Sequence, residues 1–428
     1  MKLEIKNGRV LDPASGVDGV QSVFCAAGRV VALGAAPEGW VANRVIDATD
    51  LVVAPGLIDL AAHVAGPGMK AGALLESEVR AAAAGGVTSL VCPPDSYPAL
   101  DDAGTVEMLR HRAQSLGSTH VHPLGALTLG LKGEHLSEMN ALHASGCIAF
   151  SQGAQPIANT EVLRRAMQYV ATLGYTVWLQ PRDPWLGVDG VMHEGEVSTR
   201  LGLAGISALA ETLAVRTYLA LAQQTGCALH LCRISCAESV AIVRAARASG
   251  VKVSCDVSAT HLHLIDVNVG YFDTRARLNP PLRTDADRKA LRSGLADGTI
   301  DAIVSQHVPV AADGKNVPFG EAEPGASALE TLLSLTLKWA QEENMSLLQA
   351  LAPLTQASAR IAGLPGGKLS VGNAADLCIL DPGAYRVIGP TSFGGASKSS
   401  PFVGYELPGV VRYTVVGGRL VHEAAAAA

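Results

Sequence analysis

The chain has 428 residues, of which 48% are hydrophobic, and its formal net charge is −6. That length is enough for one large domain of about 250 to 300 residues and a smaller second one. The mild acidity excludes a basic footprint for nucleic acid or for an anionic membrane, and no apolar run approaches the roughly 20 residues of a membrane span. No signal peptide is visible and the eight cysteines are scattered. We therefore predict reduced thiols and a cytoplasmic location.

Short strands and tight turns are predicted for residues 1–53. Leu3, Ile5 and Val10 recur at strand spacing around the turn at Asn7-Gly8. The segments 28–33 and 45–47 continue this pattern. No segment there has the period of a helix, so the N-terminal part is predicted to be a small all-β unit.

From Pro55 onward, strand patterns alternate with helix patterns. The predicted strands cover residues 57–63, 87–92, 121–126, 147–151, 176–179, 228–234, 251–257 and 301–305. The predicted helices cover residues 76–84, 160–173, 208–225, 237–248 and 285–295. Eight such units over about 300 residues indicate an α/β fold of the (β/α)8 TIM-barrel type.

The helix pattern ends near Gly363, and residues 366–421 return to short strands. The simplest closure pairs these strands with the N-terminal ones. We therefore predict a barrel domain of residues 55–365 and a β-sandwich domain built from residues 1–54 and 366–428. No function is assigned to the terminal Ala424–Ala428 tract.

Barrel enzymes place their reacting groups at the C-terminal ends of the strands. In the first strand, Asp59, Ala61 and His63 lie at alternate positions and are predicted to share a face. A zinc hydrolase would place a second imidazole beside His63, but the methyl group of Ala61 binds nothing. The other predicted strand ends supply Asp95, Gln152, Gln180, Arg233, Gln306 and His307.

Three of these residues are glutamines, namely Gln152, Gln180 and Gln306. A neutral amide oxygen is a poor ligand compared with the carboxylate, thiolate or imidazole that zinc prefers. Arg233 is a permanent cation and would repel a divalent ion. We therefore predict that no metal cofactor binds, with His63 the one good ligand and Asp59 behind it.

Several other histidines have two interpretations. The pairs His261/His263 and His120/His122 have H-x-H spacing, but without a third ligand nearby such pairs are more often loop or core histidines. His307 could face the pocket or could be a buried histidine bonded to backbone.

The remaining nucleophile candidates favour packing roles. Cys232 and Cys236 have no partner pair for a soft metal, and Ser151 and Ser305 lack a nucleophile-elbow pattern. No phosphate loop of the G-x-x-x-x-G-K-[ST] type occurs.

Over nearly its whole length the chain resembles the dihydroorotase family of the amidohydrolase superfamily. The resemblance lies in A-P-G-L-I-D-L (54–60), A-A-A-A-G-G-V-T-S-L-V-C-P-P (81–94), L-K-G-E-H-L-S-E-M (131–139), H-E-G-E-V-S-T-R-L-G-L-A-G-I (193–206), N-P-P-L-R-T (279–284), G-L-A-D-G-T-I-D-A-I (294–303) and S-S-P-F-V-G-Y-E-L (399–407). Together these motifs are far more specific than a shared barrel.

Active members read D-L-H-V-H-L-R-E-P-G where this chain reads D-L-A-A-H-V-A-G-P-G. By this resemblance, His63 matches the second metal histidine and Ala61 replaces the first. Ala65 replaces the arginine that would grip the substrate carboxylate. Asp95 stands where an asparagine would help to hold the substrate.

The later motifs depart in the same way. The resemblance implies that Gln152 replaces a bridging acid or carbamylated lysine, and that Gln180 and Arg233 replace two more metal histidines. Gln306 replaces the aspartate that would bind metal and act as general base. Besides His63, only Asn279 and His307 keep the pocket identities expected of the family.

The resemblance implies a catalytically inactive dihydroorotase-like chain of pyrimidine biosynthesis, without the zinc of active relatives. Similar silent chains in bacteria are scaffolds for the catalytic chain of aspartate carbamoyltransferase, which is the implied partner in a mixed oligomer. One alternative is an active cyclic amidohydrolase with a reduced metal site around His63 and His307, with His261 or His263. Another is a small-molecule-binding regulatory module that uses Asn279, His307 and Arg233.

Overall fold

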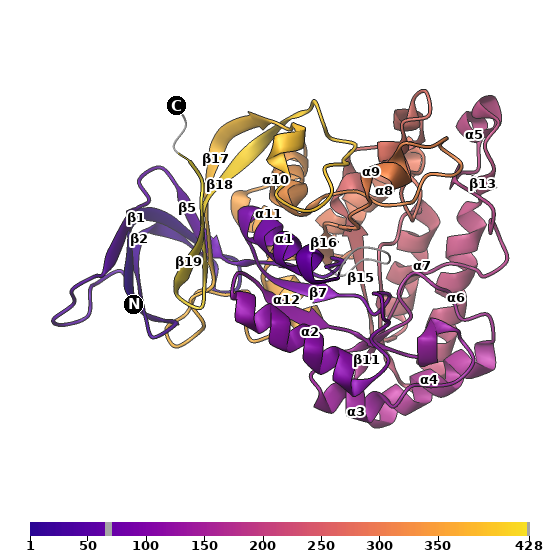
Figure 1. The fold of residues 1–428 in the computed structure, drawn as a ribbon, viewed down its shortest axis with the longest axis horizontal. Helices are drawn as coiled ribbons and strands as arrows, with labels where there is room; N and C mark the ends of the chain where they lie inside the picture. The colour runs from indigo at the N-terminus through magenta and orange to yellow at the C-terminus, as the bar shows by residue number, and fades with distance from the viewer. Residues whose placement is uncertain (65–70, 426–428) are drawn as a thin grey trace.

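A computed structural model describes residues 1–64 and 71–425 of the chain. Figure 1 shows two regions: a β-rich region at one end, where both chain termini lie, and a helix-ringed barrel that fills the rest. The predicted Ala65 lies outside the described residues, as does the end of the alanine tract. In the described part of the chain, no helix is long and apolar enough to cross a membrane.

The barrel strands are short and almost entirely buried. They are β6 (Leu57–Asp59), β7 (Val87–Cys92), β8 (His120–Pro123), β9 (Gly125–Ala126), β10 (Phe150–Ser151), β11 (Thr176–Leu179), β14 (Ala228–Leu231), β15 (Val253–Ser258) and β16 (Ala302–Val304). Neighbours pair in parallel throughout, in the orders β6-β7-β8 and β9-β10-β11-β14-β15-β16. This is the predicted α/β barrel.

The two runs of strands join at both ends. At Pro123, the predicted strand 121–126 divides into β8 and β9, which follow each other with only Leu124 between them. At the other end, a parallel bridge between Ala62 and His307 connects the segments after β6 and β16. The N–H of His63 donates to the carbonyl of His307 at 2.9 Å across this junction. The bridge closes the sheet into a barrel.

Helices surround the barrel. They are α1 (Ala71–Ala84), α2 (Ala103–Leu116), α3 (Met139–Ala144), α4 (Thr160–Thr172), α6 (Ala208–Thr225), α7 (Ala237–Ala248), α8 (Asp285–Ala296), α10 (Leu332–Glu342), α11 (Leu347–Leu351) and α12 (Gln356–Ala362). Side-chain oxygens of Asp102, Asn159, Ser207 and Thr284 cap α2, α4, α6 and α8.

Shorter elements lie in the segments between these strands and helices. They are β12 (Met192–His193), β13 (Gly205–Ile206), α5 (Glu196–Leu201), α9 (Ala312–Lys315) and the 3₁₀ turns at Leu129–Leu131, Ala259–Leu262, Asp266–Val269, Thr274–Ala276, Leu329–Thr331, Ala352–Leu354 and Pro390–Ser392.

Both chain ends contribute to a single eight-stranded sheet. Its strands are β1 (Lys2–Asp12), β2 (Val17–Ala26), β3 (Arg29–Leu33), β4 (Arg44–Asp47), β5 (Val52–Pro55), β17 (Leu377–Val387), β18 (Glu406–Val416) and β19 (Arg419–Glu423). The order is β19-β18-β17-β5-β1-β2-β3, with β4 on β1, so β5 and β17 join the N-terminal and C-terminal strands. An apolar cluster that includes Leu3, Ile5 and Ile379 gives this sheet its own core.

Two predicted strands extend three or more residues past the observed C-terminal ends. The strand predicted at 57–63 ends at Asp59, and the one predicted at 228–234 ends at Leu231. The second ends early because Arg233 adopts a left-handed conformation with φ of 56°, which is incompatible with strand geometry. All eight cysteines are buried and free, in agreement with the expectation of reduced thiols.

Candidate functional site

A cavity of about 150 Å³ opens at the C-terminal ends of the barrel strands. Its lining residues are Ala61, His63, Asp95, Ala154, Gln180, Arg233, Asn279, Gln306, Val308, Pro324 and Gly325. We call this space the barrel cavity. It brings together most of the residues that the sequence predicts for a site, from β-strand ends far apart in the chain.

His63 and Asp95 form a pair on one side of the barrel cavity. Nε2 of His63 lies 2.9 Å from Oδ1 of Asp95, and the N–H of Ala154 donates to Oδ2 of Asp95 at 3.0 Å. Burial alone would raise the pKa of Asp95. The charge and hydrogen bond of His63, the Ala154 N–H and the charge of Arg233 outweigh burial and lower that pKa. The carboxylate of Asp95, which already has two hydrogen-bond partners, therefore lies next to His63, the one expected metal histidine that this chain retains.

Arg233 lies on the opposite side, with only 7% of its surface exposed. Its guanidinium donates to Oε1 of Gln180 at 2.6 Å, and Nε2 of Gln180 donates to Oδ1 of Asn279 at 3.3 Å. A chain of neutral amides thus binds the cation, instead of a carboxylate. Both polar ends of Gln180 are occupied by these bonds.

Gln306 completes this wall of the barrel cavity. Its Nε2 donates to the backbone carbonyl of Asn279, and its Oε1 is buried with no partner among the described residues. Like Arg233, Gln306 has a left-handed backbone, with φ of 58°. The turn directs the amide toward Asn279.

Two predicted site residues, Gln152 and His307, do not line the barrel cavity. Gln152 is buried against Thr128, with its Nε2 2.9 Å from the hydroxyl oxygen. His307 is fully buried, with Nε2 2.7 Å from Oε2 of Glu78 and Nδ1 accepting the N–H of Ala328. The pocket interpretation of His307 is therefore wrong and the buried interpretation holds, because Glu78 and the N–H of Ala328 bind the imidazole outside the barrel cavity.

Asp59 also turns away from the barrel cavity. The strand prediction placed it on the same face as Ala61 and His63, but β6 ends at Asp59. Its carboxylate accepts the N–H of Ser305 at 3.0 Å as well as the Ser305 hydroxyl. Burial raises the pKa of Asp59. The carboxylate therefore ties the first strand to the last and does not support His63.

The H-x-H pairs occupy different environments. His261 and His263 are core histidines bonded to the carbonyls of Pro281 and Leu335 at 3.1 and 2.8 Å, as the pattern favoured. His120 and His122 lie on β8, at the opposite end of the barrel, and border a second cavity.

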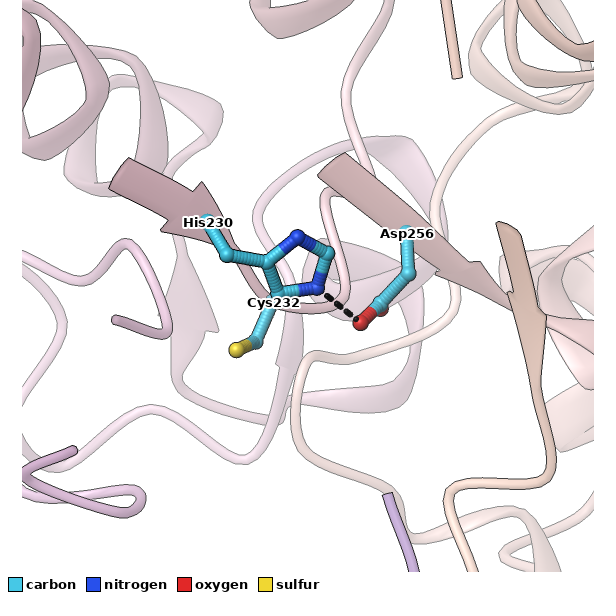
Figure 2. A group of neighbouring side chains, drawn as sticks. All are labelled: His230, Cys232 and Asp256. Atoms are coloured by element: carbon cyan, nitrogen blue, oxygen red, sulfur yellow. Dashed lines mark hydrogen bonds and ion pairs between the residues drawn. The ribbon is translucent and has the colours of Figure 1, made fainter. Parts of the chain in front are cut away.

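Sequence reasoning missed a buried group just beneath the barrel cavity, formed by His230, Cys232 and Asp256 (Figure 2). Nε2 of His230 lies 2.8 Å from Oδ2 of Asp256, and its Nδ1 lies 2.8 Å from the Ser254 hydroxyl. Oδ1 of Asp256 accepts the backbone N–H of Arg233 at 2.6 Å. The group therefore fixes the turn that directs the Arg233 side chain into the barrel cavity.

Among residues 1–64 and 71–425, this is the one cluster of three His, Cys, Asp or Glu side chains whose donor atoms lie within 4.8 Å of one another. Both ring nitrogens of His230 are already engaged. Burial raises the pKa of the Cys232 thiol far above neutrality, so the sulfur stays protonated and is a weak ligand. The group fits a structural role better than a metal site.

The barrel cavity itself does not fit zinc. Zinc would require several imidazole, carboxylate or thiolate ligands converging on one point. The described lining offers the imidazole of His63 and the carboxylate of Asp95, which are bonded to each other, opposite a guanidinium and two bonded amides. A divalent cation there would face the positive charge of Arg233, and the one carboxylate of the lining, Asp95, is already bonded to His63 and to the N–H of Ala154.

Comparisons with known proteins identify the family of the chain. A family model described as dihydro-orotase-like matches residues 50–239, and one for the amidohydrolase family matches residues 190–422. A protein named dihydroorotase-like from Pseudomonas aeruginosa is 44% identical over 99% of this chain and 100% of its own length. A protein named dihydroorotase from Citrifermentans bemidjiense is 42% identical over 99% of this chain and 100% of its own.

Solved structures share the fold. The L-hydantoinase (dihydropyrimidinase) of Arthrobacter aurescens superposes with a TM-score of 0.86 at 22% identity, covering 98% of this chain and 96% of the hydantoinase. A dihydropyrimidinase of Brevibacillus agri gives a TM-score of 0.85 at 21% identity, covering 98% of this chain and 95% of the other. The family matches and the full-length relatives together show that the chain belongs to the dihydroorotase-like proteins of the amidohydrolase family.

Proposed function

We propose that this chain is a catalytically silent dihydroorotase-like protein of pyrimidine biosynthesis that acts in the cytoplasm as an assembly partner of aspartate carbamoyltransferase. The observation that supports silence is the hydrogen bond from Arg233 to Gln180 across the barrel cavity. These two residues stand where the resemblance expects metal histidines, and they bind each other.

Ring hydrolysis in this family needs a metal-activated water and a proton acceptor. The residue expected to act as base is Gln306, an amide that cannot take up a proton at neutral pH. Asp95 is a carboxylate in the barrel cavity, but its lowered pKa makes it a weak base. Losing the metal ligands and the base together removes both requirements.

The scaffold role rests on the resemblance and on the intact fold. The strands, helices and capping residues of the barrel are complete, while the site residues are replaced. A chain that retains the fold but lacks the catalytic residues is suited to a structural role, in which its surface contacts other proteins of an assembly. The partner in this proposal is the catalytic chain of aspartate carbamoyltransferase.

The test combines three measurements on the purified chain. Elemental analysis is expected to find far less than one zinc per chain, and a dihydroorotate hydrolysis assay is expected to find no turnover. Mass measurement of the chain mixed with the transferase is expected to find a stable complex. Normal assembly and activity of the transferase in the absence of this chain would refute the scaffold role.

The competing function is an active, metal-dependent dihydroorotase. Several relatives of about 40% identity are named dihydroorotase, which favours this alternative. Its ligands would have to come from His63 and Asp95, since His307, His261 and His263 are bonded elsewhere. Stoichiometric zinc with turnover that is lost in His63→Ala would establish the enzyme and exclude the silent chain.

A further inference from the structure

A second cavity, of about 380 Å³, lies at the opposite end of the barrel from the site described above. Residues of α2, the start of β8 and the β18–β19 hairpin line it, so it opens where the barrel meets the terminal sheet. Its basic side chains are Arg110, His120, His122 and Arg419. We call it the basic cavity.

The two guanidinium groups are held by backbone rather than by acids. Arg110 donates to the carbonyl of Ser145 at 2.7 Å, and Arg419 donates to that of Gly117 at 3.4 Å. Each guanidinium lies directly against a glycine, Arg110 on Gly146 and Arg419 on Gly117, where a Cβ atom would collide with it. The described part of the chain places no carboxylate within 4.0 Å of either guanidinium. Among the described residues, neither guanidinium therefore forms an ion pair.

Of the two histidines, His120 is the one whose charged form is favoured, because its hydrogen bond to Asp376 raises its pKa. Burial, together with the charges of His120 and Arg110, lowers the pKa of His122 to about 4, so this imidazole is neutral near pH 7. Asp376 lies 3.3 Å from Nε2 of His120 and accepts the N–H of Gly417 at 2.7 Å. One carboxylate thus faces two arginines, so the basic cavity has a net positive charge although the whole chain has a charge of −6.

We propose that the basic cavity binds the phosphate group of a small phosphorylated molecule. Guanidinium groups present fixed forks of N–H donors that match phosphate oxygens, and paired arginines are suited to a dianion. A concave site with low-dielectric walls strengthens this attraction. The volume exceeds that of a phosphate ion, which leaves room for an organic portion beside the hydrophobic wall of Val121, Ile148 and Val416. This site is separate from the barrel cavity and does not depend on the function proposed above.

Isothermal titration calorimetry of the full chain with inorganic phosphate and with glycerol 3-phosphate tests the site. The double variant Arg110→Gln/Arg419→Gln is expected to weaken binding by about tenfold or more, because it removes both charge-assisted donors. Arg110→Lys keeps the charge without the fork and is expected to weaken binding less than Arg110→Gln. Thermal unfolding of each variant verifies that it folds.

The matched control is Arg112→Gln, which changes an exposed arginine on the same helix that lies outside the basic cavity. It is expected to leave binding unchanged. Tighter binding of glycerol 3-phosphate would identify a phosphorylated metabolite as the ligand, and equal binding would identify free phosphate. Absence of binding at about 10 mM phosphate, where even a millimolar site would be occupied, would overturn the proposal. Equal binding of acetate, or full binding in the double variant, would overturn it too.

Discussion

The guanidinium of Arg233 donates to the amide oxygen of Gln180 at 2.6 Å, so a cation and a neutral amide lie together in the wall of the barrel cavity. The pair is almost completely buried. A buried guanidinium needs acceptors, and Gln180 supplies one in the lining of the barrel cavity. The two replacements are therefore linked: changing one without the other leaves a buried polar group without a partner.

Gln180→Ala is expected to lower the free energy of unfolding by about 1 to 3 kcal/mol, because it leaves a buried donor of Arg233 unsatisfied. Urea denaturation followed by circular dichroism measures the change. Gln223→Ala, an exposed glutamine on α6, is the control and is expected to change stability by less than about 0.5 kcal/mol. Equal effects of the two substitutions would contradict the structural role of the Arg233–Gln180 pair.

Asp256→Ala is expected to destabilise the chain by about 3 kcal/mol, since it deprives both His230 Nε2 and the Arg233 N–H of their acceptor inside the protein. Ser254→Ala removes only the partner of His230 Nδ1 and is expected to cost about 1 kcal/mol. Chemical denaturation of both variants gives the comparison. If Asp256→Ala lowers the free energy of unfolding no more than Ser254→Ala does, the carboxylate of Asp256 does not stabilise the turn at Arg233.

The residues at the strand ends that line the barrel cavity could be predicted, because the parallel strands of a barrel all end on one side. Gln180 follows an apolar run directly, and Asp95 follows a Pro-Pro turn after another. Local patterns of this kind identify where a strand ends, and the barrel then brings the ends together. The same reasoning does not give side-chain direction once the strand has ended.

Two errors show that limit. His307 follows Gln306 by one residue, and its direction is decided by Glu78, which lies 229 positions away in the sequence. The early end of β14 depends on Asp256 in the neighbouring strand, whose carboxylate takes the N–H of Arg233. Register between strands brings such partners together, and register cannot be deduced from one strand alone.

His261 and His263 are expected to make the fold sensitive to acid. Burial lowers the pKa of each to about 4, from an ordinary value of 6.5. Between pH 6.5 and 4 the unfolded chain therefore binds protons that the folded chain does not, so stability is retained above pH 6.5 and falls as the pH decreases. Each histidine contributes a slope of up to about 1.4 kcal/mol per pH unit.

In the double variant His261→Asn/His263→Asn, the free energy of unfolding is expected to fall less steeply between pH 7.5 and pH 4.5 than in the natural chain. The variant will be less stable at pH 7.5, since two hydrogen bonds to carbonyls change, and the difference from the natural chain will shrink toward pH 4.5. His111→Asn, at an exposed position on α2, should leave the slope unchanged. Parallel curves of the free energy of unfolding against pH for the double variant and the natural chain would contradict the assignment of this acid sensitivity to His261 and His263.

Metal removal is expected to leave the natural chain unaffected. Dialysis against EDTA should not change the melting temperature, and adding zinc should not raise it. A site occupied at 100 times its dissociation constant would stabilise the fold by about 2.7 kcal/mol, which is easily measured by thermal unfolding. The variant Ala61→His/Gln180→His/Arg233→His supplies three imidazoles beside His63 and removes the cation, so it should gain a zinc-dependent increase in melting temperature. If zinc stabilises the natural chain instead, His63→Ala and Cys232→Ala will distinguish the barrel cavity from the buried group beneath it, and either result would disprove the metal-free state.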